Sequence, residues 1–191
     1  MRRLLQIGAD ELLIIASAGG GNVGAPLMKA VIQAFKQLAT PKPCHLKMFS
    51  GPFMEGGEFS ALKKMGGRNV QIEQFTPDFL SYLAAADLSV SMGGYNTTMN
   101  LLASGVPALV WPFPQNREQR LRAGRLAKEG ILKVIEDEDL RPDRLAGHMD
   151  QMLATRKRLP GKYDLDGAAN TARWIGQFQS GVRCQVSAPP P

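Results

Sequence analysis

The chain has 191 residues, of which 44% are hydrophobic and 21% are charged, and its formal net charge is +6. This length and composition are typical of one globular domain with a proper core. No run approaches the ~20 apolar residues of a membrane-spanning helix, and the apolar run after Met1 is too short for a signal peptide. Cys44 and Cys184 lie far apart and indicate neither a disulfide framework nor a metal motif. These features exclude a transmembrane protein, and we expect a cytoplasmic one.

Strand and helix patterns alternate from one end of the chain to the other. The predicted strands cover residues 12–17, 45–49, 70–75, 86–90, a run that begins at 108, and 132–135. The predicted helices cover residues 27–38, 79–84, a segment that starts at 96–98 and stops at 105, 118–129, 141–153 and 168–178. This alternation predicts an α/β fold with a doubly wound, parallel, six-stranded sheet. We expect a lead-in over residues 1–10, one domain over 11–180 and a disordered tail over 181–191.

The first glycine loop follows the first predicted strand. Gly19, Gly21 and Gly24 fit the G-x-G-x-x-G spacing of dinucleotide-binding folds. That interpretation needs an acidic residue at the end of the second strand, but the first carboxylate beyond that strand is Glu55. An NAD-linked oxidoreductase is therefore kept only as an alternative. The glycines still allow the backbone to approach a ligand at the sheet edge.

Residues 91–107 are the segment most informative about function. Gly93 and Gly94 turn the chain after a buried strand, and Asn96, Thr97 and Thr98 are suited to capping the helix that follows. Such a junction presents unpaired backbone N–H groups and the positive end of a helix dipole. Anions, phosphate above all, bind there. The alternative is a tight connection that binds nothing.

A second buried strand begins at Ala108 and leads into a polar loop framed by prolines, over residues 112–119. Two successive strands would then end in polar loops at the carboxyl edge of the sheet, where ligands of open α/β sheets bind. Five cations follow: Arg117, Arg120, Arg122, Arg125 and Lys128. A solvated helix face, an anionic ligand and an acidic membrane surface all fit this cluster. No aromatic platform accompanies it, so nucleic acid is not an expected partner.

Several short motifs share one order with a known family. They are Ala18-Gly19-Gly20-Gly21, Glu73-Gln74-Phe75-Thr76, Gly93-Gly94 with Thr97-Thr98, Gly105-Val106-Pro107 and Pro112-Phe113. Over about residues 11–155 the chain resembles the C-terminal half of GT-B glycosyltransferases, and within them family 28, the MurG-like group. The resemblance implies a Rossmann-like half that binds a nucleotide-diphosphate sugar, with UDP as the expected nucleotide. Catalysis would take place in a cleft between two halves.

The resemblance also implies a set of donor-binding residues. The backbone around Phe75 and Thr76 would hold the base, and the helix start over residues 93–98 would hold the diphosphate. The full expected set is Gly20, Gly21, Phe75, Thr76, Gly93, Gly94, Tyr95, Asn96, Thr97, Thr98, Asn100, Gln115, Asn116 and Gln119, the last three near the sugar. No D-x-D or paired carboxylate follows a strand. We therefore expect no metal and no cofactor besides the donor.

Two departures from the family pattern bear on activity. The family usually has a ribose-binding glutamate where this chain has Asn100. The acceptor-binding N-terminal half, with the general base expected there, is absent from this sequence. His45 and His148 are expected to be structural or exposed, so the catalytic residues stay unknown. The expected function is the donor-binding half of a hexosyltransferase, inactive without an N-terminal half on another chain or a missing segment. A non-catalytic nucleotide-sugar-binding module, or a degenerate half-enzyme, is the alternative, and peripheral membrane contact stays open.

Overall fold

The computed structural model describes residues 1–155 and 163–182, which fall into two units. The first unit contains the sheet, and the second contains the helix α7 (Gly167–Val182). Residues 183–191 of the predicted tail, with Cys184, lie outside the described residues. The predicted division at residues 10 and 180 stays a prediction. Within the described ranges, no helix combines the length and the apolar character needed to cross a membrane.

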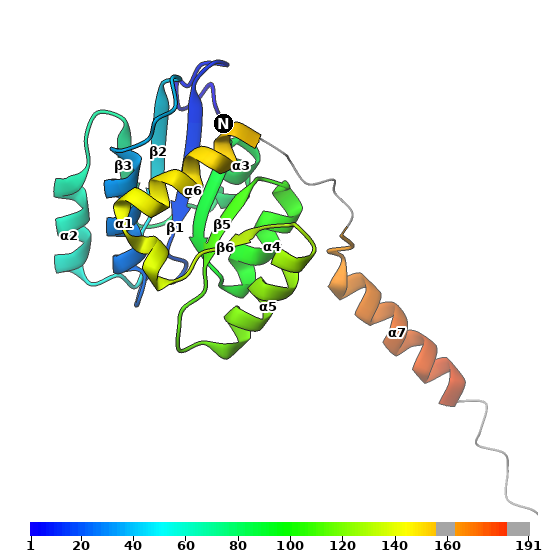
Figure 1. Cartoon of the computed structure of the whole chain (residues 1–191). Coiled ribbons are helices and arrows are strands. Elements are labelled where there is room, and N and C mark those ends of the chain that lie inside the picture. The colour runs from blue at the N-terminus through cyan, green and yellow to red at the C-terminus, as the bar shows by residue number, and fades with distance from the viewer. Residues whose placement is uncertain (156–162, 183–191) are drawn as a thin grey trace, which may run out of the picture. The chain divides into compact units, whose positions relative to one another are not determined.

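The sheet of the first unit has six parallel strands (Figure 1). They are β1 (Leu12–Ser17), β2 (Cys44–Phe49), β3 (Val70–Glu73), β4 (Leu88–Met92), β5 (Ala108–Trp111) and β6 (Lys133–Val134). Their order is β3-β2-β1-β4-β5-β6, and every neighbouring pair is parallel. The predicted doubly wound sheet is therefore confirmed. The order reverses between β1 and β4, and ligands of such sheets bind at the carboxyl ends of these two strands.

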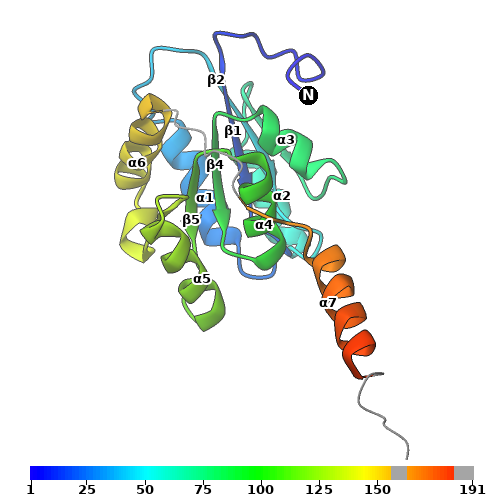
Figure 2. The same cartoon turned by 90° about the vertical axis from the view of Figure 1, so that its right-hand side faces the viewer.

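Helices cover both faces of the sheet, as Figures 1 and 2 show for α1 and α6 on one side and α3 and α4 on the other. One apolar cluster joins the sheet to α1 (Ala25–Phe35), α2 (Gly56–Met65) and α6 (Pro142–Thr155). The other joins it to α3 (Phe79–Ala85), α4 (Tyr95–Ser104) and α5 (Arg117–Lys128). A short 3₁₀ helix, η1 (Asp137–Leu140), precedes α6.

Strand β1 shows why the apolar run predicted its position. Leu12, Ile14 and Ala16 belong to the first cluster, while Leu13 and Ile15 belong to the second. Because successive side chains point to opposite faces, a strand covered on both faces must be apolar throughout. The bounds of β1 match the prediction for this reason.

Other bounds differ from the prediction. β3 ends at Glu73, two residues earlier than predicted, and β4 runs from Leu88 to Met92 instead of residues 86–90. The helix α2 was not predicted at all. It opens with two glycines and buries only Leu62 among its residues, so it has no clear apolar period in the sequence.

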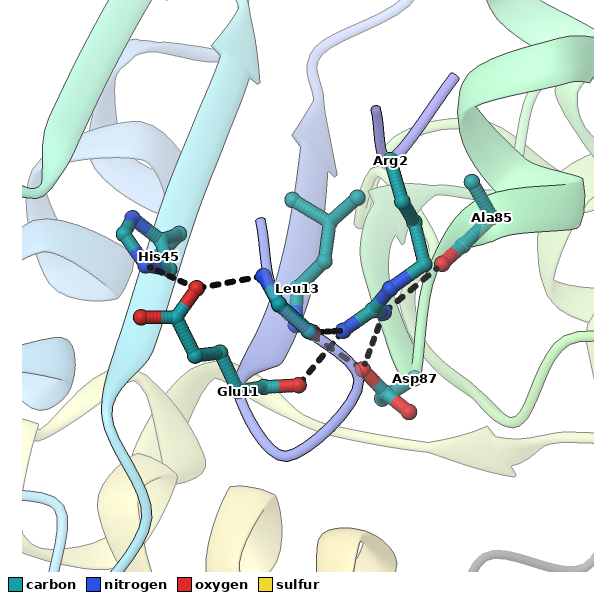
Figure 3. A network of polar contacts seen from close by, with 7 residues as sticks. Arg2, Glu11, Leu13, His45, Ala85 and Asp87 are labelled. Atoms are coloured by element: carbon teal, nitrogen blue, oxygen red, sulfur yellow. Dashed lines mark hydrogen bonds and ion pairs between the residues drawn. The ribbon is translucent and has the colours of Figure 1, made fainter. Parts of the chain in front are cut away.

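The lead-in, residues 1–10, is held at the amino edge of the sheet by one guanidinium (Figure 3). Arg2 Nη1 donates to Asp87 Oδ2 at 3.0 Å and to the carbonyl of Ala85 at 3.2 Å. Its Nη2 donates to the carbonyls of Gly8 at 2.8 Å and Glu11 at 2.6 Å. These contacts bind the lead-in to the edge opposite the glycine loops.

Candidate functional site

A pocket of about 430 Å³ lies at the carboxyl edge, where the strand order reverses. Four parts of the chain form it: the end of β1 with its glycine loop, the end of β2 with the loop after it, the chain from β3 into α3, and the first turns of α4. The lining residues are Ser17, Gly19, Gly20, Phe49, Pro52, Gln74, Phe75, Thr76, Phe79, Gly94, Tyr95, Asn96, Thr97 and Asn100. The structure therefore brings together the parts of the expected set that precede residue 101, apart from Gly21, Gly93 and Thr98.

The first turn of α4 forms one wall of the pocket. The predicted capping by Asn96, Thr97 and Thr98 is wrong, because the helix starts at Tyr95 and its N-cap is Gly94, which has no side chain to bond. Thr98 Oγ1 instead donates to the carbonyl of Gly94 at 2.8 Å. Among the described residues, the N–H groups at positions 95–97 have no hydrogen-bond acceptor. Three free donors and the helix dipole thus face an exposed pocket, as an anion site requires.

The glycine loop after β1 is shaped by backbone contacts with the loop after β2. Gly21 and Gly51 have φ values of +101° and +89°, which side chains rarely adopt. A Cβ on Gly51 would lie 2.4 Å from the carbonyl oxygen of Gly19, and one on Gly21 would lie 2.7 Å from that of Ser50. Gly19 and Gly20 are exposed to the pocket, whereas Gly21 is buried behind them. Gly21 thus shapes the loop without lining the pocket.

Aromatic rings form another part of the pocket lining. Phe75 lines the pocket and is 66% exposed, a large apolar surface left open to solvent. Phe49 and Phe79 also line the pocket and pack edge to face, with their ring centroids 5.7 Å apart. Neither ring belongs to the set of binding residues predicted from the sequence. Flat rings beside backbone polar groups suit a planar heterocycle such as a nucleotide base.

The loop between β5 and α5 does not line the pocket. Asn116 caps α5, its Oδ1 accepting the N–H of Gln119 at 3.0 Å. Gln119 Oε1 accepts the N–H of Phe113 at 3.0 Å. Gln115 is exposed, while Gly93 and Thr98 are buried behind the first turn of α4. The expected place of Gln115, Asn116 and Gln119 near a sugar stays a prediction, and two of them have local structural roles.

Tyr95 is the titratable side chain in the described lining of the pocket, and the charged side chains lie elsewhere. Within the described residues, the pocket lining contains no carboxylate, histidine, lysine or arginine. His45 Nε2 lies 3.5 Å from Glu11 Oε2, and His148 Nε2 lies 3.1 Å from Asp139 Oδ1, both outside the pocket. Burial raises the pKa of Cys44 to about 12, so its thiol stays protonated at neutral pH. The pocket can bind and can stabilise negative charge, but it supplies no general base.

No group of three or more metal-ligating side chains occurs in the part of the chain that the structure describes. The hydrogen-bond donors of the pocket include the free N–H groups of α4 and the amide side chains of Asn96 and Asn100. The expectation that no metal takes part stays a prediction.

Known proteins with similar sequences identify the family to which the chain belongs. The family model of the glycosyltransferase family 28 C-terminal domain matches residues 16–171. One relative, from Caldicellulosiruptor saccharolyticus, is 28% identical to this chain over 152 residues. Its name is UDP-N-acetylglucosamine--N-acetylmuramyl-(pentapeptide) pyrophosphoryl-undecaprenol N-acetylglucosamine transferase. That match covers 77% of this chain and 40% of the relative. The enzyme of the same name from Vibrio vulnificus is 33% identical over 147 residues, covering 76% of this chain and 40% of the relative.

Solved structures show the same fold. The crystal structure of Acinetobacter baumannii MurG has a TM-score of 0.72 at 21% identity, covering 92% of this chain and 52% of that one. The calicheamicin glycosyltransferase CalG4 has a TM-score of 0.63 at 21% identity, covering 91% and 44%. The chain thus spans only about 40% of the length of the curated relatives it matches. It belongs to the glycosyltransferase family 28 C-terminal domain family.

Proposed function

We propose that this chain is the donor-binding half of a glycosyltransferase that moves a hexosyl group from a nucleotide-diphosphate sugar, with UDP as the nucleotide. The observation that carries the proposal is the uncapped first turn of α4 in a pocket that also exposes a glycine loop and aromatic rings. The names of two relatives begin with a UDP-linked sugar, which favours UDP among the nucleotides.

In this proposal, different residues bind the different parts of the donor. The base lies against Phe75 and the chain around Thr76, the ribose lies near Asn100, and the diphosphate meets the N–H groups at positions 95–97. When the sugar leaves, negative charge grows on the diphosphate. Backbone N–H groups already aimed at that position stabilise the charge without reorganising.

The other half of the enzyme supplies what this chain lacks. The described pocket lining offers no side chain that could take a proton from an acceptor hydroxyl. We therefore place the acceptor site and the general base on an N-terminal half, on another chain or in a segment outside this sequence. The chain alone should bind nucleotide and transfer sugar poorly.

A binding assay tests the proposal directly. We expect UDP to raise the melting temperature of the full chain and to release heat in calorimetry, with GDP and dTDP weaker and NADH without effect. Stabilisation by NADH alone would favour the dinucleotide alternative. If none of the nucleoside diphosphates binds, the proposal is wrong. Efficient sugar transfer by this chain with no partner present would contradict the half-enzyme part of it.

A second candidate function is a non-catalytic nucleotide-sugar-binding module. It is favoured by Asn100, which stands where the family usually has a charged ribose ligand. Both candidates predict UDP binding, so binding alone does not separate them. Transfer activity restored by an added acceptor-binding half would support the enzyme, and tight donor binding with no restored transfer would support the module.

A further inference from the structure

We propose that Arg122 on α5 is a positioning residue for the diphosphate site, acting through the Gly93–Gly94 peptide and the ring of Tyr95. The inference rests on the proposed function and extends it to a side chain outside the pocket lining. Arg122 is one of five cations on α5, but its surroundings differ from those of a solvated helix face. Its side chain is only 18% exposed.

Three contacts define the place of the guanidinium. Arg122 Nη2 donates to the carbonyl of Gly93 at 3.0 Å, and Nη1 lies 2.5 Å from Glu118 Oε1. The guanidinium carbon lies 5.4 Å from the centroid of the Tyr95 ring. Arg122 Nε is buried and has no hydrogen-bond partner in the described part of the chain. A cation is therefore held against the carbonyl of Gly93, just before the N-cap of α4, and against the ring of Tyr95, the first residue of that helix.

The bond to Gly93 fixes the direction of an N–H group. In a planar trans peptide the C=O and the N–H point in opposite directions. Because Arg122 binds the carbonyl of Gly93, the N–H of Gly94 points away from α5, and Gly94 lines the pocket. A glycine pair has little steric resistance to rotation of the peptide between its residues. Removing the Arg122 side chain would remove the side-chain hydrogen bond that the structure shows for this carbonyl. The peptide would then be free to rotate.

The peptide on the other side of Gly94 is held independently. Its carbonyl accepts from the N–H of Thr98 at 2.9 Å and from Thr98 Oγ1 at 2.8 Å. The start of α4 is thus fixed from within by Thr98 and from outside by Arg122. The guanidinium also holds the ring of Tyr95, which is 61% exposed and lines the pocket. Its positive charge adds to the positive end of the α4 helix dipole.

The test compares three variants of the full chain: Arg122→Met, Arg122→Lys and Arg125→Met. Arg125→Met is the matched control, since it removes the same charge from the same helix at an exposed position with no contact to Gly93 among the described residues. Calorimetry measures the affinity for UDP, or for whichever nucleoside diphosphate binds best, and for the corresponding nucleoside. The ratio of the two affinities reports on the diphosphate alone.

Arg122→Met should lower the affinity for the nucleoside diphosphate by about tenfold, which is the effect of losing one interaction with a charged group. The affinity for the nucleoside should not change. Arg125→Met should lower the affinity for the nucleoside diphosphate by less than about threefold, because salt screens exposed charges. Arg122→Lys keeps the charge and one donor and should fall between wild type and Arg122→Met. It carries the test if circular dichroism shows that Arg122→Met does not fold.

Two results would overturn the role of Arg122 while leaving the proposed function intact. One is equal diphosphate affinity in the Arg122 and Arg125 variants. The other is an equal loss for diphosphate and nucleoside, which would mark a merely structural residue. A wild-type chain that binds no nucleoside diphosphate would remove the proposed function and this inference together.

Discussion

Asn100 lies one turn into α4, on the same pocket wall as Asn96 and Thr97. The resemblance places a ribose ligand at this position, and the structure leaves Asn100 partly exposed in the pocket. An amide can accept one hydrogen bond and donate another, but it lacks the charge of a carboxylate. Hydrogen bonds to charged groups contribute about 1.5–3 kcal/mol, against about 0.5–1.5 kcal/mol for neutral ones.

The substitution Asn100→Glu should therefore tighten UDP binding by roughly tenfold. The gain should be smaller for 2′-deoxy-UDP, because one of the hydroxyls that the carboxylate would bind is missing. Calorimetry with both ligands measures the difference. Asn96→Glu is the control, since it places a new negative charge in the first turn of α4 and should weaken UDP instead. No change in Asn100→Glu would mean that the residue does not meet a ribose.

Glycine at position 51 is a second single-residue feature with a measurable effect. A methyl group there would meet the backbone of Gly19 at 2.4 Å, at a φ of +89°. Gly51→Ala should lower the free energy of unfolding by about 2–4 kcal/mol, combining left-handed strain with overpacking. The substitution should also weaken UDP binding, because it would displace Gly19, which lines the pocket.

Gly56→Ala provides the control for this prediction. Gly56 opens α2 and has nothing within 4 Å of a Cβ built on it. Alanine should be neutral or slightly stabilising there, since it favours the helix. Urea unfolding of both variants gives the comparison, and equal stability of Gly51→Ala and wild type would show that the two loops do not touch as described.

The sequence predicts the position of a helix or strand best where both faces of that element are buried. The strands β1 and β5 are buried throughout, and apolar runs mark them clearly. The helix α2 buries only Leu62, so its pattern is too weak to predict. The cap of α4 was mispredicted for another reason. Asparagine and threonine are good caps by type, but the helix begins one residue before them, and a glycine takes the cap position.

The residues of the candidate site also differ in how well the sequence predicts them. Glycine motifs and the start of α4 could be predicted because short local patterns carry them. Phe49 and Phe79 could not, since the end of β2 and the start of α3 come together only in the folded chain. Gln119 shows the converse. Its residue type suits a sugar ligand, but its Oε1 oxygen bonds the N–H of Phe113. A local bond of this kind cannot be distinguished from a ligand contact in the sequence.

The element η1 links the sheet edge to α6 through a carboxylate. Asp139 Oδ2 accepts the N–H of Glu136 at 3.0 Å, and Asp139 Oδ1 lies 3.1 Å from His148 Nε2 on α6. The backbone bond first, and His148 after it, lower the pKa of Asp139 below its ordinary value of 3.8. A carboxyl group with a lowered folded pKa stabilises the fold above its unfolded pKa, and this stability is lost as the pH falls through the folded pKa.

Stability should therefore decline below about pH 4 in part through Asp139. The variant Asp139→Asn should be less stable than wild type at pH 7 and should lose less stability between pH 4 and lower pH. Urea unfolding at a series of pH values measures both slopes. Glu138→Gln on the same 3₁₀ helix is the control and should follow the wild-type slope. Parallel curves for Asp139→Asn and wild type would show that this carboxylate does not couple folding to protons.

The described residues separate into a unit with the sheet and a unit with α7. Every residue that lines the pocket lies between Ser17 and Asn100, and the proposed positioning residue Arg122 belongs to the same unit. That unit has two apolar clusters of its own, one on each face of the sheet. The helix α7 exposes Trp174, Ile175 and Phe178.

A chain that stops after Thr155 should therefore fold and keep the UDP affinity of the full chain. Its circular dichroism should change only by the loss of one helix, and its calorimetric dissociation constant should not change, because each contact proposed for the nucleotide lies within the first unit. Sugar transfer supported by an added acceptor-binding half is a separate measurement. If the shortened chain binds UDP normally but no longer supports transfer, α7 serves the two-part enzyme and not the donor. If it folds and loses UDP, residues after 155 complete the nucleotide site, and the pocket described at the carboxyl edge is only part of it.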